Sequence, residues 1–354
     1  MFQGMKSSRR LSLLIALALS VGGTAVFNHV HAADVTGGDV LVDAGHPAPT
    51  PTAAGNAHDI PGVTDNRNVK GNKLTVNGIL LGRDVIGGYT FGNGDATHNE
   101  IILENGAYLN NNNEGYGGWS ANGNATHNTV TLDGVNPVMG GLAYLSGGRS
   151  GNTAADVTTG NVLQIKNKDN ATYAISNFEK MKFVLGSGIA SGDTMLTVSS
   201  NSSWHWGTSY KPMTFDWGNI EVENAATWGT GAGVSKRVTL YTGAALTLNN
   251  YSITSAMHTA GDFEYGLSTN TTTPTASSVS ATQIYFDRNQ FKNGNEQVTS
   301  AGAGLRFGGT STMGNTTTKN KLTLSGAFVW SGDVIGGETQ WEVGDATHNE
   351  IILE

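Results

Sequence analysis

Cysteine is absent from this chain of 354 residues, and charged residues make up only 14% of it. Without thiols the chain can form neither disulfides nor thiolate metal sites, so backbone pairing and packing must supply its stability. The charged share is well below the usual ~25%. The net charge is −8 and the sequence holds no basic cluster. A nucleic-acid partner is therefore not expected, because phosphate binding needs clustered Lys and Arg.

Long apolar runs are also missing, with one exception near the N-terminus. Three basic residues between positions 6 and 10 precede an apolar stretch at 11–27, and small residues follow it. This order predicts a secretory signal peptide at residues 1–32, cleaved between Ala32 and Ala33 and directing export across the inner membrane. An uncleaved membrane anchor is the alternative interpretation.

Proline is scarce, with seven residues in the chain, and four of these lie between positions 33 and 71. The prolines there are mixed with Ala, Thr, Gly and Asp, a composition that disfavours a packed core. We therefore expect residues 33–71 to form an extended linker between the signal peptide and the rest of the chain.

A repeated motif is the main positive feature of the sequence. Residues 94–104 recur letter for letter at 344–354, and a looser copy begins at Gly123. The shared element is Asn, a variable residue, and then aliphatic residues at the second and fourth positions after Asn. Its copies begin at Asn72, Asn99, Asn128, Asn161, Asn320 and Asn349, and the first four lie 27, 29 and 33 residues apart.

Each copy predicts one short strand with a single buried face, because its aliphatic residues alternate with mostly polar ones. One such strand cannot bury its own face, but stacked copies can, which is the principle of a solenoid. We therefore expect an all-β parallel solenoid over residues 72–354, with an irregular β-rich section or divergent coils at 171–310. Leu74, Ile101, Val130 and Leu163 should point inward on neighbouring coils. On this basis Leu132→Asp should cost several kcal/mol, and the outward Thr131→Asp much less.

Paired glycines recur between the repeat strands, at 87–88, 117–118, 140–141 and 336–337. Glycine takes backbone conformations with positive φ and allows close approach of a neighbouring segment. We interpret these segments as loops that form the tight corners of the solenoid. The repeated Asn residues should be turn residues whose amides hydrogen-bond along the stack.

His98, His127 and His348 share one repeat position, so consecutive rings could stack about 4.8 Å apart. Such a pair could bind a metal or respond to pH, and the simpler interpretation is a solvated turn residue beside the Asn stack. The segment 92–95 is weakly similar to the calcium nonapeptide but lacks its nine-residue spacing. We predict no metal site and no cofactor.

The sequence gives little support for catalysis. Its acidic residues are scattered, and neither a Gly-x-Ser-x-Gly elbow nor a repeated carboxylate pair occurs. A tryptophan-rich segment includes Trp204, Trp206, Trp217 and Trp228. These side chains could form an exposed platform for carbohydrate or a receptor, or they could fill the core or cap it. No catalytic residue is predicted.

The signal peptide, the Gly-Asn/Asp-Ala-Thr-His-Asn-x-Ile/Val-x-Leu repeat, the Asp-Val-Ile-Gly-Gly segments and the segment 178–198 together carry a resemblance. The chain resembles passenger domains of autotransporter adhesins from Gram-negative bacteria. The resemblance implies a right-handed parallel β-helix on the cell surface or outside it. It also implies export through a C-terminal outer-membrane barrel, and this chain stops within a repeat at Glu354. We therefore expect an N-terminal fragment or a truncated product.

The expected function is that of a non-catalytic adhesin or stalk. Its partner would be a glycan or protein of the host-cell surface or matrix, or another copy of the chain. The alternative is a β-helical enzyme that degrades polysaccharide, as a lyase or a hydrolase, and an exposed cleft with converging carboxylates would favour it. At the C-terminus, residues 349–354 would present an uncovered strand edge, which predicts self-association or fraying there.

Overall fold

The computed structural model describes most of residues 67–290 and shorter pieces at 35–56 and 295–354. The gaps within 67–290 are 79, 82–83, 110–112, 134–143, 202–212, 230–235, 253–256, 261–262 and 272–276. All described residues lie within the compact unit of residues 34–354. The predicted signal peptide, with its cleavage site at Ala32 and Ala33, lies outside the described residues.

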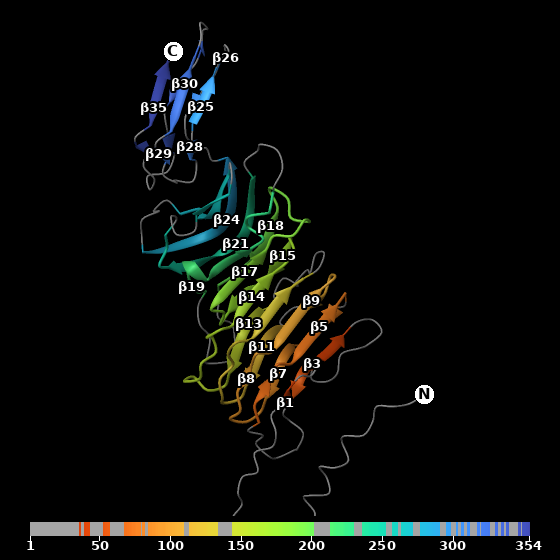
Figure 1. Cartoon of the computed structure of the whole chain (residues 1–354). Helices are drawn as coiled ribbons and strands as arrows, with labels where there is room; N and C mark the ends of the chain where they lie inside the picture. The colour runs from red at the N-terminus through yellow and green to blue at the C-terminus, as the bar shows by residue number, and fades with distance from the viewer. Residues whose placement is uncertain are drawn as a thin grey trace, which may run out of the picture. The chain divides into compact units, whose positions relative to one another are not determined.

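The stacked parallel coils of the described part form a β-solenoid, as the repeat predicts, and the one helical element of the described part is the short 3-10 helix η1 (Trp217–Asn219). Figure 1 shows successive strands of one seven-stranded parallel sheet side by side. That seven-stranded parallel sheet contains β2 (Asp39–Val42), β5 (Lys73–Asn77), β9 (Glu100–Glu104), β12 (Thr129–Leu132), β14 (Val162–Ile165), β17 (Lys180–Val184) and β20 (Ile220–Glu223).

The other faces of the coils are smaller parallel sheets. The five-stranded sheet contains β3 (Thr52–Asn56), β7 (Val85–Thr90), β11 (Glu114–Ser120), β13 (Tyr144–Ser150) and β16 (Ala174–Ser176). Two narrow sheets contain β1 (Val35–Thr36), β4 (Val69–Lys70) and β8 (Ala96–Thr97), and β6 (Leu80–Leu81) with β10 (Tyr108–Leu109).

Inward-facing aliphatic residues of the seven-stranded sheet form continuous rows across the coils. Leu74, Ile101, Val130 and Leu163 pair in register, and all four are fully buried. A second row runs parallel to it and contains Val76, Leu103, Leu132, Ile165, Phe183 and Val222. The inward orientation predicted from the alternation is therefore confirmed.

Asparagine side chains form a second continuous feature inside the coils, which we call the Asn ladder: Asn72, Asn99, Asn128 and Asn161. The Nδ2 group of each residue donates to the Oδ1 atom of the next, at 2.9, 3.1 and 3.4 Å. The same Oδ1 atoms accept the backbone N–H of the preceding coil's asparagine. All four residues are buried, so the predicted hydrogen bonding along the stack is confirmed.

The interpretation of the paired glycines as corners is wrong for the pairs at 87–88 and 117–118, and the pairs at 140–141 and 336–337 lie outside the described residues. Gly87–Gly88 and Gly117–Gly118 lie within β7 and β11, where they face the Asn ladder. A Cβ atom at Gly88 would lie 2.4 Å from Asn99 Cγ, and one at Gly118 would lie 2.7 Å from Asn128 Nδ2. Close approach, and not positive φ, is thus what these positions require. On the next coil, Gly147–Gly148 in β13 is the pair in register with Gly117–Gly118.

Two further expectations need correction. The predicted linker contributes β1, β2 and β3, since Val40 and Val42 pair in register with Leu74 and Val76 and the prolines fall outside these strands. Thr131 points outward but is fully buried, with its Oγ1 3.4 Å from Glu100 Oε1 and 3.3 Å from Gln164 Oε1. Thr131→Asp is therefore not the mild substitution that the alternation predicts.

The parallel pattern gives way to an antiparallel one at β21 (Lys236–Asn249). The long strand β21 continues a parallel sheet on one edge and pairs antiparallel with β24 on the other, and β23 and β22 extend the sheet from there. The strands concerned are β15 (Asn170–Thr172), β18 (Thr194–Val198), β19 (Thr214–Asp216), β21 (Lys236–Asn249), β22 (Met257–Ala260), β23 (Phe263–Thr269) and β24 (Ser278–Gln290).

Parallel pairing resumes in the last part of the chain, in a sheet of β25 (Asn295–Val298), β30 (Lys321–Leu324) and β35 (Glu350–Leu353). Short paired strands accompany it: β26 (Gly302–Ala303) with β31 (Trp330–Ser331), β27 (Arg306–Phe307) with β32 (Val334–Ile335), β28 (Thr310–Ser311) with β33 (Glu338–Thr339), and β29 (Thr317–Thr318) with β34 (Ala346–Thr347). In β35, Leu353 is 75% exposed, whereas its twin Leu103 is fully buried.

Candidate binding surface

An aromatic cluster lies on the outer side of the five-stranded sheet, and we call it the aromatic face: Tyr89, Phe91, Tyr116, Trp119 and Arg149. The glycine pairs determine which residues of neighbouring coils lie side by side on this face. In β7, β11 and β13 the residue after each pair points away from the Asn ladder. Tyr89, Trp119 and Arg149 therefore occupy equivalent positions on three successive coils. Thr90, Ser120 and Ser150 follow them and are buried.

The rings of the aromatic face pack against one another. Tyr89 and Trp119 stack with their centroids 4.3 Å apart, and Phe91 meets their rings edge-on at 4.8 and 5.8 Å. Burial raises the pKa of Tyr89 to about 12, partly opposed by nearby Arg149, so its hydroxyl stays neutral. Phe91 is 42% exposed, which leaves an apolar ring of the cluster in contact with solvent.

Arg149 supplies the polar border of the aromatic face. Its Nη1 group donates to Glu114 Oε2 at 2.9 Å and to the hydroxyl of Tyr116. The guanidinium also lies 5.2 Å from the centroid of the Tyr116 ring. A rigid group of rings with a fixed, half-buried cation beside it suits a partner that presents both apolar surface and hydrogen-bonding groups.

The histidines singled out in the sequence lie at a corner next to the Asn ladder. His98 and His127 have φ angles of 57° and 58°, and Gly71 and Gly160 take the same left-handed conformation on the flanking coils. The two rings stack in parallel with centroids 5.0 Å apart, as the shared repeat position predicts. Partial burial lowers the pKa of His98, with further contributions from His127 and Lys70. His348 lies outside the described residues.

Asp95, from the segment weakly similar to a calcium motif, belongs to a turn. Its Oδ1 atom accepts the backbone N–H of Asn124 at 2.7 Å, and its own N–H donates to Asn68 Oδ1 at 2.8 Å. Asn124 Oδ1 in turn accepts the N–H of Asp156 at 2.9 Å. These side chains join coils along the surface. Within the described ranges, His, Asp and Glu side chains form no group of three or more that could hold a metal ion.

Two of the tryptophans in the irregular section fill the core. Trp217 and Trp228 are 2% and 5% exposed, and their indole N–H groups donate to the carbonyl oxygens of Ser252 and Ile189. Core filling is therefore confirmed for these two, and Trp204 and Trp206 lie outside the described residues. The sequence interpretation missed Trp119. The recurrence of Gly-Gly-x-Thr/Ser at residues 87, 117 and 147 is the signal that identifies its register.

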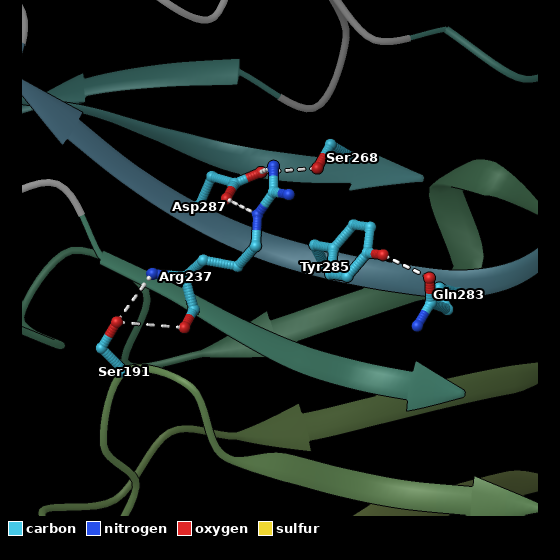
Figure 2. A network of polar contacts seen from close by, with 6 residues as sticks. All are labelled: Ser191, Arg237, Ser268, Gln283, Tyr285 and Asp287. Carbon is cyan, nitrogen blue, oxygen red and sulfur yellow. Dashed lines mark hydrogen bonds and ion pairs between the residues drawn. The ribbon is translucent and has the colours of Figure 1, made fainter. Parts of the chain in front are cut away.

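A polar cluster in the antiparallel sheet joins β21, β23 and β24 (Figure 2). Arg237 forms a bidentate pair with Asp287, with Nε–Oδ1 at 2.5 Å and Nη2–Oδ2 at 3.0 Å. Ser268 donates to the same carboxylate at 2.5 Å, and the guanidinium lies 4.4 Å from the Tyr285 ring centroid. Hydrogen bonding to Asp287 raises the pKa of Arg237. Because the carboxylate is shared between Arg237 and Ser268, the cluster acts as a clamp between strands.

No family model, curated protein or solved structure matches this chain. Among the described residues, no helix is long and apolar enough to cross a membrane.

Proposed function

We propose that this protein is a non-catalytic, surface-exposed autotransporter passenger that acts as an adhesin or stalk. The observation that carries the proposal is the aromatic face: a stacked tyrosine and tryptophan, an exposed phenylalanine and a fixed arginine on successive coils. Aromatic residues and arginine are enriched at the centres of protein interfaces. The resemblance of the repeat to autotransporter adhesins supports the same assignment, with a host-surface or matrix glycan or protein as the partner.

The parallel coils support this function physically. The rings of Tyr89, Tyr116 and Trp119 are held by strands that are paired on both edges, and Phe91 directly follows β7. The Asn ladder lies directly beneath the glycine pairs. Side chains on such strands lose little conformational freedom when a partner binds, which favours affinity. A stalk role would use the same coils without the aromatic face.

Adhesion of beads coated with the full chain to cultured epithelial cells and to immobilised matrix tests the proposal. The double variant Phe91→Ser, Trp119→Ser should bind at least about tenfold fewer beads, because two interface rings are lost. Gln164→Ser on the seven-stranded sheet is the matched control and should bind like the unsubstituted chain. Circular dichroism must show both variants folded.

Equal adhesion by the folded double variant would contradict an adhesin role for the aromatic face. The enzymatic alternative predicts a different result in a parallel assay. Release of reducing ends or unsaturated uronates from polysaccharides incubated with the full chain would contradict the non-catalytic assignment.

A further inference from the structure

The apolar rows of the seven-stranded sheet end at β20. Within the part of the chain that the structure describes, β20 has a single neighbour in that sheet, β17. Ile220 and Val222 continue the rows of Met181 and Phe183 in register. Met181 and Phe183 are fully buried, whereas Val222 is only half-buried, so the end of its row reaches the surface.

A cavity of about 220 Å³ lies at this end, between β20 and the hairpin of β22 and β23. Val222 and Ala225 form one side of it, and Tyr265, Leu267 and Phe286 form the other. An adjoining open depression of about 400 Å³ shares Val222, Ala225, His258 and Tyr265 with it. None of the described residues that line the cavity or the depression is Asp, Glu, Lys or Arg. The space therefore suits an uncharged, bulky side chain.

The outward positions of β20 are acidic. Glu221 and Glu223 alternate with Ile220 and Val222, and their side chains are 43% and 47% exposed. On the β17 side, Lys180 pairs with Glu221 at 3.0 Å and Lys182 with Glu223 at 2.7 Å. Opposite charges on neighbouring strands stabilise a sheet, so a further strand beside β20 would favour Lys or Arg at its outward positions.

We propose that the edge of β20 and the adjoining cavity form a docking site for an extended segment of a partner protein. The segment pairs with β20 as the next strand, about 4.8 Å away, and inserts one bulky apolar side chain beside Val222. Its outward residues are Lys or Arg, facing Glu221 and Glu223. This surface is separate from the aromatic face and does not depend on the proposed adhesin function.

Fluorescence anisotropy with a labelled peptide, Thr-Lys-Phe-Lys-Leu-Lys-Thr, tests the proposal on the full chain. Ala225→Trp should fill the cavity and weaken binding about tenfold or more, because the apolar side chain can no longer be buried. The double variant Glu221→Lys, Glu223→Lys should reverse the charge preference. It should bind Thr-Glu-Phe-Glu-Leu-Glu-Thr more tightly than the original peptide.

Two controls separate the site from general effects. Ala190→Trp, in an exposed turn, and Glu100→Lys, on β9, should leave peptide affinity unchanged. Equal binding by Ala225→Trp, equal binding of a peptide with Ser in place of Phe and Leu, or no binding at millimolar peptide would each overturn the proposal. A dimer that Ala225→Trp abolishes and the peptide does not displace would assign the cavity to a second copy, and this too would overturn it.

Discussion

At the residue scale, Asn128 shows how one buried amide joins three coils. Its Oδ1 atom accepts two donors from Asn99, and its Nδ2 group donates to the Ala96 carbonyl oxygen at 2.9 Å. The same Nδ2 group also donates to Asn161 Oδ1, on the following coil, at 3.4 Å. Because water cannot reach these groups, removing the amide leaves several of them without partners.

We predict that Asn128→Ala lowers the free energy of unfolding by about 3 kcal/mol or more. Asn124→Ala, on the same coil, is the control. The Asn124 side chain accepts the N–H of Asp156 on an exposed surface, so losing this side chain should cost less than about 1 kcal/mol. Urea unfolding followed by circular dichroism compares the two. Similar midpoints would contradict the importance assigned to the Asn ladder.

His98 gives the fold a dependence on pH. Its pKa is lowered by partial burial, by His127 and by Lys70. A histidine with a lowered folded-state pKa binds protons first in the unfolded chain, so stability is complete above about pH 6.5 and falls as pH decreases below it. The effect is modest because the imidazole is largely solvated.

We expect the melting temperature to fall between about pH 7.5 and 5.5 in the unsubstituted chain, and to fall less in His98→Asn. Asparagine tolerates the left-handed backbone at this corner, so the variant keeps the coil geometry. The low pKa of Asp156 does not interfere. Burial raises it, but hydrogen bonds from Thr159 and Thr158 more than offset this, so that carboxylate titrates below the window. An unchanged pH dependence in His98→Asn would contradict the assignment.

At the element scale, the clamp of Arg237, Asp287 and Ser268 fixes β24 against its neighbours (Figure 2). Asp287 is 6% exposed at its side chain, whereas Arg237 is 53% exposed. The strength of the Arg237–Asp287 ion pair therefore lies between that of a surface ion pair and that of a buried one. We predict that Asp287→Asn costs about 2 kcal/mol.

Hydrogen exchange provides the measurement for this variant. Protection should fall in β23 and β24, while β5 and β9, in the parallel coils, should keep theirs. Uniform loss of protection across all strands would show that the clamp supports the whole fold, and no loss would show that it is dispensable.

The parallel coils could be predicted from the sequence because each aliphatic pair and its Asn residue lie within five residues of one another. The antiparallel strands could not, since β21 and β24 pair across a separation of dozens of residues with no repeated motif. The role of the glycine pairs depends on which side chain faces them across the coil, which spacing alone does not reveal. The aromatic face could not be predicted either, because its recognition requires the register between coils. Only that register shows that Tyr89 and Trp119 lie side by side.

At the scale of the whole molecule, the apolar rows couple neighbouring coils. Leu132 lies in contact register with Leu103 and Ile165 and is fully buried. We predict that Leu132→Asp destabilises the chain by several kcal/mol, because an unpaired carboxylate would be buried. Gln164→Asp, at a half-buried outward position, replaces Thr131→Asp as the control and should cost much less. Comparable urea midpoints would refute the assignment of the two faces.

The direction of the Asn ladder has a mechanical consequence. Every hydrogen bond between two asparagines of the ladder joins neighbouring coils. A load applied along the chain would therefore break these bonds in sequence, one coil after another. Each step would release a repeat of 27, 29 or 33 residues. At about 3.4 Å per residue, a pulled molecule would lengthen in steps of roughly 100 Å. Each step would dissipate mechanical work.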